Sequence, residues 1–310
     1  MLSGLDQISG GQHGALRRRL RDARLGVLTH AAAVDRRGRQ TLTVLEELGA
    51  APCILFTPEH GFDASAQAEE PVEARPHDNG SGLALPVVSL YGKRKEELAP
   101  SAEQLANIDV LLIDLTDVGS RYYTYVWTAL LAARAAAAAS IHTVLLDRPN
   151  PISGDPTTLE GAPQSDGYLS FVGLEPLPIR HALTVGEILA RFFERDGLAL
   201  GPEGALSVVP VQGWERHRNA EAWGRPFVLP SPNMPTLETA LVYPAAVSSK
   251  ARTSPRAAAR RCRSRSSARR SSTAPGSHGS SVKPVFLAPG CDPSRFDRSS
   301  TNTPGRSARA

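Results

Sequence analysis

Short apolar runs alternate with amphipathic helical patterns along the first half of the chain. The apolar runs predict strands at 25–30, 51–57, 85–92, 109–115 and 142–147. Helical periodicity predicts helices at 41–50, 101–107 and 124–139, and Ser101 is the expected N-cap of the second. Strands that are separated by helices at this spacing form right-handed βαβ units. The pattern therefore predicts an α/β domain with a doubly wound parallel sheet over residues 1–150.

The pattern changes between residues 151 and 244. Proline-rich connections there surround one predicted helix, 183–197, and one predicted strand, 205–211. These elements predict a second, smaller α/β domain that is truncated after its first elements. Because the remaining elements are missing, we expect the apolar faces of this helix and strand to lack partners and the region to be loose.

Charge divides the chain near residue 245. The 310 residues include 35 Lys+Arg and 31 Asp+Glu, which gives a formal net charge of +4. Residues 245–310 hold 14 of the basic and 2 of the acidic side chains. Residues 1–244 therefore hold 21 basic and 29 acidic side chains. The body is acidic, and the excess positive charge lies in a tail rich in Arg and Ser. With few apolar residues and no periodicity, residues 245–310 are predicted to be disordered.

The cysteines and the apolar runs indicate where in the cell the protein is expected. Cys53 lies in the run APCILF, where we expect a small core residue, and the other two cysteines lie in the tail, so no disulfide framework is indicated. The first 20 residues lack the apolar core of a secretion signal, and no run is long enough to span a membrane. We expect a soluble, cytoplasmic protein without a membrane partner.

Polar clusters follow three of the predicted strands. PEHGF comes after 51–57, TDVGSRYYTY after 109–115 and RPNP after 142–147. In an open parallel sheet the ligand crevice lies beyond the carboxyl ends of the strands. The three clusters are therefore expected to meet in one site at this edge of the sheet.

Several motifs between residues 25 and 244 occur in a characteristic order. They are GVLTHAAAVDR, FTPEHGF, LPVVSLYG, DVLLIDLTDVGSRYYTYVWT, LDRPNP, LEGA, FVGLEPLPIRHALTVGE and PSPNMPTLETALVYP. In these motifs the chain resembles the exo-β-N-acetylmuramidase family typified by NamZ, long catalogued as a domain of unknown function. The resemblance implies a Rossmann-like domain followed by a smaller α/β domain, with the site between them.

The resemblance also implies a function. It indicates a glycoside hydrolase that releases terminal N-acetylmuramic acid from the non-reducing end of peptidoglycan fragments, as in peptidoglycan recycling, so that muramic acid glycosides would be its partners. The sequence departs from the family pattern at 30–33, where His-Ala-Ala-Ala stands and the family usually has Asn-Pro-Thr-Gly. It also departs at Thr57, often Gly in the family, and at Ala162, usually Pro.

Three carboxyl groups in these motifs are candidates for the cleavage step, which usually needs a pair of them. Glu59 stands at a strand end beside His60 and Phe62, where partial burial would suit a general acid by raising its pKa. Glu160 in LEGA is the best match for the second carboxylate, and Asp117 is a third candidate. The alternative for each is a surface or capping carboxylate.

N-acetylmuramic acid carries a lactyl carboxylate, so its site should contain a cation. The matched motifs contain Arg121, Arg148 and Arg180, and a guanidinium can bind a carboxylate through two parallel hydrogen bonds. The alternative is a structural ion pair with a neighbouring Asp.

The remaining candidates would contact neutral groups of the sugar. Tyr123 and Tyr125 alternate along RYYTY, so one of them is expected to face the sugar while Tyr122 packs inward, although a core role fits equally well. Asn150 and Asn233 lie next to prolines, where they either bind acetamido or hydroxyl groups or serve only a rigid loop.

Two histidines complete the predicted site. His60 and His181 are expected to contact the substrate. Their spacing with Asp114 or Asp117 matches no local metal-ligand motif, so we expect neither a metal nor another cofactor.

The Arg/Ser tail has two interpretations. When it is back-translated and read one nucleotide earlier, permitted codons allow a Gly-Arg-Gly-Thr-Thr segment with Pro-Phe close behind it, which the family usually carries after LVYP. A frameshift after Pro244 would explain the change of composition, the reversal of charge and the lost motif together, and would impair the enzyme. The alternative for the tail is RNA binding through phosphate contacts, although the tail lacks aromatic residues between its arginines. For the protein as a whole, the alternative to an enzyme is a non-catalytic sugar-binding protein. We expect no specific nucleic-acid partner.

Overall fold

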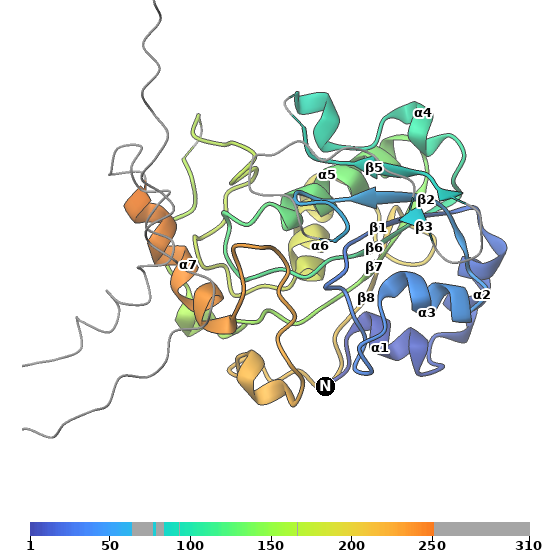
Figure 1. Cartoon of the computed structure of the whole chain (residues 1–310). Coiled ribbons are helices and arrows are strands. Elements are labelled where there is room, and N and C mark those ends of the chain that lie inside the picture. The colour runs from blue at the N-terminus through green and yellow to red at the C-terminus, as the bar shows by residue number, and fades with distance from the viewer. Residues whose placement is uncertain (64–76, 79–83, 93, 166, 251–310) are drawn as a thin grey trace, which may run out of the picture. The chain divides into compact units, whose positions relative to one another are not determined.

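A six-stranded parallel sheet forms the centre of the computed structural model, which describes residues 1–63, 77–78, 84–92, 94–165 and 167–250 (Figure 1). The strands are β1 (Leu25–Thr29), β2 (Pro52–Thr57), β5 (Val87–Ser89), β6 (Val110–Asp114), β7 (His142–Leu146) and β8 (Leu206–Val209). Each predicted strand is found within two residues of its expected bounds, except that the 85–92 run is divided between β5 and the short β4. The predicted α/β class with a doubly wound parallel sheet is confirmed.

The strand order explains where a ligand can bind. Across the sheet the order is β5-β2-β1-β6-β7-β8, and every neighbouring pair is parallel. The chain thus winds outward from β1 in one direction and then outward from β6 in the other, as in the Rossmann arrangement. The switch point lies between β1 and β6, where the loops that leave the two strands diverge and open a crevice.

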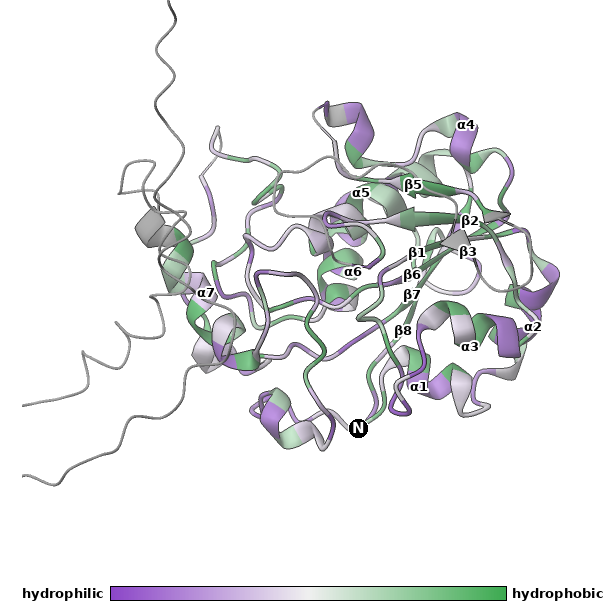
Figure 2. Cartoon of the chain, viewed as in Figure 1, coloured by the Kyte–Doolittle hydropathy of each residue, from purple (hydrophilic) through white to green (hydrophobic). Residues whose placement is uncertain are grey.

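Helices cover both faces of the sheet. On one face α1 (Gly4–Ser9), α2 (Gly14–Asp22) and α3 (Thr41–Glu47) pack their apolar side chains against Val110 and Leu112 of β6. On the other face α5 (Tyr125–Ala138) and α6 (Val185–Arg195) pack against Leu111 and Ile113. Successive side chains of a strand point to opposite faces, so one apolar strand serves both layers. Figure 2 shows the strands as hydrophobic and α2 as largely hydrophilic.

The centre of the sheet is fully buried, whereas one edge is not. All residues of β1, β6 and β7 are buried, as expected for continuous apolar runs. In β2 only the last three residues are buried, and Cys53, near its start, is exposed with its Sγ 3.4 Å from the Leu25 carbonyl oxygen. The expectation that Cys53 is a core residue was wrong, because the apolar run reaches the core only in its second half.

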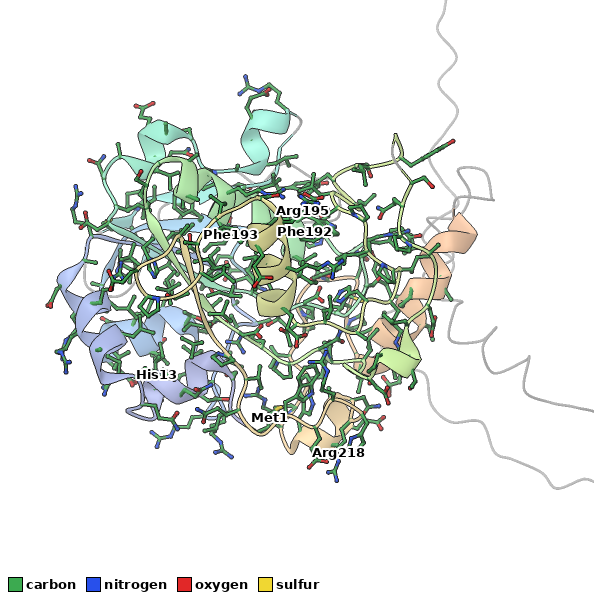
Figure 3. All side chains as sticks on the ribbon, turned by 180° about the vertical axis from the view of Figure 1, so that it is seen from behind. Met1, His13, Phe192, Phe193, Arg195 and Arg218 are labelled. Carbon is green, nitrogen blue, oxygen red and sulfur yellow. The ribbon has the colours of Figure 1, made fainter. Side chains whose placement is uncertain are left out.

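The region after residue 150 is part of the same sheet. β8 pairs with β7 from Thr143↔Leu206 to Leu146↔Val209, so the sheet extends past the boundary that the sequence placed at residue 150. The helix of this region, α6, is also covered: Phe192 and Phe193, labelled in Figure 3, are 3% and 0% exposed. The expectation of uncovered apolar faces in 151–244 was wrong, because α5 and the sheet supply the partners of α6.

Shorter elements complete the described chain. β3 (His77–Asp78) and β4 (Ala84–Leu85) form an antiparallel pair, and α4 (Ala102–Leu105) begins at the predicted N-cap Ser101. The 3-10 helices are η1 (Lys95–Leu98), η2 (Pro156–Thr158) and η3 (Ala220–Trp223). None of the described helices is long and apolar enough to cross a membrane.

The last described element passes the point where the composition changes. Helix α7 (Leu237–Lys250) contains Pro244 in its interior and continues for six residues beyond it. Disorder from residue 245 onward was therefore a wrong prediction for 245–250. Residues 251–310, including most of the Arg/Ser tail, lie outside the described residues.

Candidate functional site

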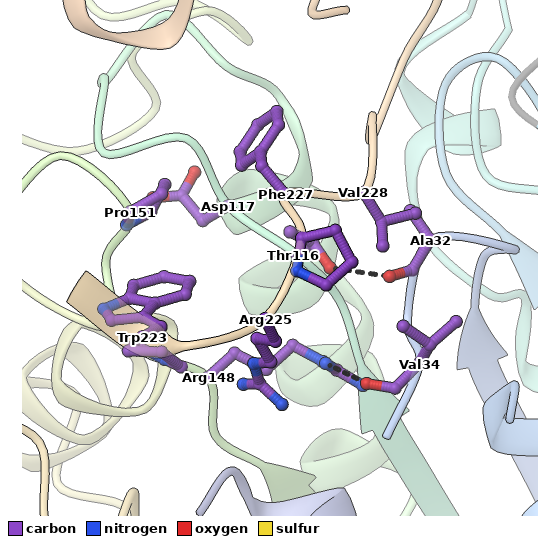
Figure 4. Close-up of a pocket in the computed structure, with 12 residues that line it drawn as sticks. Ala32, Val34, Thr116, Asp117, Arg148, Pro151, Trp223, Arg225, Phe227 and Val228 are labelled. Carbon is purple, nitrogen blue, oxygen red and sulfur yellow. Dashed lines mark hydrogen bonds between the residues drawn. The ribbon is translucent and has the colours of Figure 1, made fainter. Parts of the chain in front are cut away.

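A pocket lies at the switch point of the sheet, beyond the carboxyl ends of β1, β6 and β7 (Figure 4). Loops that follow these strands form one side of it, and the segment after η3 forms the other. The lining residues are Ala32, Val34, Thr116, Asp117, Arg148, Pro149, Pro151, Trp223, Arg225, Pro226, Phe227 and Val228. Apolar walls with a few polar groups are typical of a small-molecule site. The predicted location at the carboxyl edge fits this pocket.

Asp117 is the buried carboxylate of the pocket. It is 5% exposed, and its Oδ2 accepts a hydrogen bond from the Gly119 N–H at 2.9 Å and lies 3.2 Å from His181 Nε2. His181 Nδ1 accepts the Leu183 N–H at 3.2 Å, which leaves the proton of a neutral ring on Nε2, facing Asp117. Asp117 Oδ1 is buried and has no hydrogen-bond partner among the described residues. Such an acceptor suits a ligand that brings its own donor.

Gly119 holds the Asp117 loop in a conformation that other residues avoid. Its φ is +79°, and a Cβ there would lie 2.4 Å from Asn150 Oδ1 and 2.5 Å from Ile152 Cγ1. Only glycine allows both the left-handed turn and this close approach. The loop after β6 is therefore locked against the loop after β7.

Glu59 lies at the end of β2 and is 8% exposed. The Thr124 hydroxyl donates to Glu59 Oε2 at 2.8 Å, and the Tyr125 hydroxyl donates to the Glu59 carbonyl oxygen at 2.9 Å. Thr124 is the N-cap of α5, so the start of this helix fixes the side chain. The structure thus places Glu59 as a buried, oriented carboxyl group next to the switch point.

The turn after β2 is strained at His60. This residue is 6% exposed and has a φ of +75°, which is rare for residues other than glycine. Such backbone strain is concentrated at functional sites. The Phe62 carbonyl oxygen accepts the Ala31 N–H at 2.7 Å, which joins this turn to the loop after β1.

His30 is a central residue of this edge that the sequence did not identify as functional. It is fully buried, its Nε2 accepts the Thr116 N–H at 3.1 Å, and its ring packs edge-on against Tyr125 with 5.0 Å between centroids. Burial lowers the pKa of His30 to about 3, and the nearby Arg148 charge acts in the same direction. His30 is thus a neutral ring that links the loops after β1 and β6.

Tyr123 and Tyr125, one of which was expected to face the sugar, are both core residues, which agrees with the alternative interpretation. Tyr123 and Tyr125 are 5% and 0% exposed, with 4.6 Å between their ring centroids, while Tyr122 is only partly buried. Burial raises the pKa of both hydroxyl groups above the usual value, so they stay protonated. The predicted alternation was wrong because RYYTY is not a strand: it is a turn that leads into α5.

Each of the three predicted arginines binds protein groups. Arg148 forms a two-pronged ion pair with Asp114 (Nε–Oδ1 2.5 Å, NH2–Oδ2 2.8 Å), and its NH1 donates to the Val34 carbonyl oxygen at 2.9 Å. Arg121 NH1 donates to the carbonyl oxygens of Ala162 and Leu177 at 2.9 and 2.5 Å. Arg148 thus forms the structural ion pair of the alternative interpretation, whereas Arg121 is held by backbone carbonyl oxygens and forms no ion pair with the described residues.

Glu160 and Arg180 form a pair with each other outside the pocket lining. The distance between Arg180 NH1 and Glu160 Oε1 is 3.0 Å, and Arg180 NH2 also donates to the Ile152 carbonyl oxygen at 2.5 Å. The Glu160 side chain is 53% exposed. Of the three predicted carboxyl groups, the fold buries Glu59 after β2 and Asp117 after β6, and leaves the Glu160 side chain largely exposed.

The two predicted asparagines differ. Asn150 is 1% exposed, with Nδ2 donating to the Leu183 carbonyl oxygen at 3.0 Å and Oδ1 accepting the Ile152 N–H at 3.1 Å, so it serves its own loop. Asn233 is partly buried, and its side chain makes no hydrogen bond with the described residues. Its amide stays a prediction for substrate binding.

Sequence reasoning missed the side of the pocket that is formed by η3 and the segment after it. Trp223, Arg225 and Phe227 come from the segment AWGRPF, which does not directly follow a strand and lies outside the quoted motifs. The available signal was a Trp, an Arg and a Phe gathered beside Gly and Pro in a short segment. Among the described residues, no group of His, Cys, Asp and Glu side chains could hold a metal ion.

Comparison with known proteins identifies relatives of this chain. The family model described as "Exo-beta-N-acetylmuramidase NamZ, N-terminal" matches residues 25–238. The "Peptidoglycan beta-N-acetylmuramidase NamZ" of Bacillus subtilis (strain 168) is 39% identical over 230 residues, which are 74% of this chain and 53% of that protein. The family resemblance inferred from the motifs is confirmed.

Two solved structures share the fold, and both are DUF1343 family proteins from Bacteroides fragilis NCTC 9343. The first is 32% identical with a TM-score of 0.65, and the similarity covers 79% of this chain and 59% of that one. The second is 24% identical with a TM-score of 0.59, and covers 78% and 60%. The chain thus spans between about half and three-fifths of the length of the relatives it matches.

Proposed function

Since the chain belongs to the family of the N-terminal part of the exo-β-N-acetylmuramidase NamZ, we propose that it is a glycoside hydrolase. Its substrates would be peptidoglycan fragments from which it releases the terminal, non-reducing N-acetylmuramic acid. A pocket at the end of the sheet, rather than a long groove, suits an enzyme that takes one terminal sugar at a time.

One observation carries the proposal beyond family membership. Two carboxyl groups are buried beyond the carboxyl ends of the strands: Asp117 lines the pocket, whose walls include Trp223 and Phe227, and Glu59 follows the neighbouring strand β2. Aromatic side chains offer apolar surface to the carbon face of a sugar ring, and carboxyl groups carry out acid and base steps in glycoside cleavage.

Glu59 is proposed as the general acid. It would protonate the glycosidic oxygen while the C–O bond breaks, and the Thr124 hydroxyl would keep its carboxyl group oriented. Burial of the side chain fits a group that must carry a proton to the leaving oxygen. Water then completes the reaction at the anomeric carbon.

A second carboxylate would activate that water or attack the anomeric carbon. Asp117 fits this role because it is buried, lines the pocket and has an unpartnered Oδ1 among the described residues. Glu160 remains the alternative on the strength of its motif, although its ion pair with Arg180 and its exposure favour Asp117.

The test is hydrolysis of a chromogenic N-acetylmuramic acid β-glycoside by the parent protein and by Glu59→Gln, each made from the gene as it stands and from the gene with its reading frame repaired after Pro244. The substitution preserves shape and the contact with Thr124 but removes the proton, so we expect a loss of about 10²–10⁴-fold in rate. Glu46→Gln, an exposed residue of α3, is the matched control and should retain the parent rate. Sugar binding without release by any form would instead indicate a non-catalytic sugar-binding protein.

We further propose that the reading frame shifts after Pro244. The composition changes there, the family match ends at residue 238, and a shifted reading allows the Gly-Arg-Gly-Thr-Thr segment. The nucleotide sequence around the codon for Pro244 tests this directly. If the frame is shifted, the product of the repaired gene should hydrolyse the glycoside faster than the chain with the Arg/Ser tail; equal rates would contradict impairment.

The setting is also part of the proposal. An enzyme that removes single terminal sugars would act on small, released fragments, as in peptidoglycan recycling in the cytoplasm. Assay of cytoplasmic and secreted fractions of a producing cell tests this, and activity confined to the secreted fraction would contradict it.

A further inference from the structure

The lactyl carboxylate of N-acetylmuramic acid needs a cation that protein groups have not already saturated. Arg148 also lines the pocket, but both of its guanidinium edges are occupied by Asp114 and Val34. Arg121 donates to backbone carbonyl oxygens, and Arg180 donates to Glu160 and to a backbone carbonyl oxygen. Neither arginine lines the pocket. The cation must therefore be sought elsewhere in the lining.

Arg225 meets this requirement. Its side chain is 17% exposed and lines the pocket, and its NH1 forms an ion pair with Asp6 Oδ2 at 3.0 Å. Neither its Nε nor its NH2 makes a hydrogen bond with the described residues. The guanidinium carbon lies 5.9 Å from the centre of the Trp223 ring. One edge of the guanidinium is thus anchored while another can bind a ligand.

The charge of Arg225 is incompletely compensated. Burial lowers its pKa below the usual value; the Asp6 carboxylate acts in the opposite direction, and the positive charge of Arg148 lowers the pKa further. A carboxylate that enters the pocket would offset both the burial and the repulsion from Arg148. An anion is therefore the ligand group that this position favours.

Other unpartnered groups show what else the ligand must offer. Asp117 Oδ1 lacks a donor and Trp223 Nε1 lacks an acceptor among the described residues. In Figure 4 Asp117 lies beside Pro151, whereas Arg225 lies beside Arg148. The pocket therefore combines an acceptor with unused donors, which fits a ligand that carries both a donor and a carboxylate.

We propose that Arg225 binds the lactyl carboxylate and thereby sets the preference for N-acetylmuramic acid over N-acetylglucosamine, which lacks this group. The proposal rests on the glycosidase function proposed above and assigns a specificity-determining residue to its site. The carboxylate would accept hydrogen bonds from Nε and NH2 of Arg225, while Asp117 stays available for the cleavage step.

The experiment is a calorimetric titration of the full chain with N-acetylmuramic acid and with N-acetylglucosamine. We expect the parent protein to bind N-acetylmuramic acid more tightly. Arg225→Gln should reduce this preference by about 10- to 100-fold, the range for a charge-assisted hydrogen-bonded pair. The amide of N-acetylmuramic acid, which lacks the negative charge, should bind the parent protein about as weakly as N-acetylglucosamine does.

Arg216 provides the matched control. It also stacks on a tryptophan, Trp214 at 5.0 Å, and forms an ion pair with Glu187, but it does not line the pocket. Arg216→Gln should retain the preference, which separates a local role of Arg225 from a general loosening of the fold. The amide titration needs no variant, so it tests the inference even if Arg225→Gln does not fold.

The outcomes distinguish the inference from the proposed function. Equal affinity of the parent protein for both sugars, no affinity for N-acetylmuramic acid, or a preference that survives in Arg225→Gln would overturn the role of Arg225, whatever the hydrolysis assay shows. Failure of hydrolysis with the preference intact would overturn the glycosidase and leave a pocket that recognises the carboxylate.

Discussion

The two ends of the parallel sheet carry the same kind of ion pair in opposite surroundings. At the carboxyl end Arg148 and Asp114 are 8% and 0% exposed, and at the amino end Arg24 and Asp109 are 58% and 47% exposed. Both arginines bind their carboxylates through two nitrogens. Only the carboxyl end therefore removes charge from water, and we attribute this difference to the ligand site that it holds.

Burial of polar groups distinguishes the two ends more generally. His30, Glu59, His60 and Asp117 are all buried beyond the carboxyl ends of the strands. A second hollow, at the amino end, is lined mainly by small and aliphatic side chains, with Asp109 and Ser140 as its polar members. A fold that needs only stability has no reason to bury so many titratable groups at one edge, because each costs desolvation. The comparison supports function at the carboxyl end.

Breaking the buried ion pair should have the largest effect on stability. Arg148→Met would leave the Asp114 carboxylate buried with the Thr41 hydroxyl, 2.6 Å from its Oδ2, as the remaining side-chain donor. We expect the free energy of unfolding to fall by about 3–5 kcal/mol, since an unpaired buried charge is left behind. Urea unfolding measures it. Arg24→Met at the amino end is the control and should change stability far less, because both partners are exposed; equal losses would contradict the comparison.

A smaller effect is expected when the loop after β6 is forced apart. Gly119→Ala and Gly38→Ala place a methyl group at the same backbone angle, φ +79° and +78°, but only the first meets other atoms within 4 Å. Both substitutions should lower the free energy of unfolding because alanine disfavours the left-handed backbone angle. Gly119→Ala should lower it by about 1–3 kcal/mol more because of overpacking. Thermal unfolding compares them. Identical losses of stability would show that the loop after β6 can move to accommodate the methyl group, which would contradict its close packing against the loop after β7.

His30 predicts a still smaller, pH-dependent difference. Its pKa is about 3 in the fold and about 6.5 when unfolded, so the unfolded chain alone takes up a proton as the pH falls below 6.5. The contribution of His30 to the free energy of unfolding is fully present above pH 6.5 and declines as the pH falls toward 3. Between pH 8 and pH 5 we expect the parent to lose about 1–2 kcal/mol more than His30→Asn, which cannot be protonated.

The difference between the parent and the variant isolates His30 from an opposing group. Burial raises the pKa of Asp147 to about 7, so its contribution falls as the pH rises toward 7, and it is present in both proteins. Urea midpoints at several pH values give the difference. A difference that stays constant with pH would contradict the neutral, buried state of His30.

The fold was largely predictable because its signals are local. Continuous apolar runs at β1, β6 and β7 could be buried only between two helical layers, and Ser101 marked its helix correctly. The pairing of β7 with β8 was not predicted, because β8 comes about 60 residues later in the chain. Proline-rich spacing conceals such long-range pairing, since each segment alone resembles a separate unit.

The site was predictable in location but less so in its members. The strand-end rule placed Glu59 and Asp117 correctly at the carboxyl edge. It could not tell that Arg148 would be saturated by Asp114, because Asp114 reads as the last residue of a buried strand. Nor could it find Arg225, which does not directly follow a strand. Arg225 is positioned by Asp6, which is distant in sequence, and by Trp223, which is two residues before it.

The central claim is that the carboxyl end of the sheet, and not the amino end, holds the ligand. Amide hydrogen exchange of the full chain with and without N-acetylmuramic acid tests it most directly. The account predicts slower exchange in peptides that cover 116–119 and 223–228, and unchanged exchange at 102–109 and 139–141. Protection at the amino end, or no protection at the carboxyl end with saturating sugar, would contradict it.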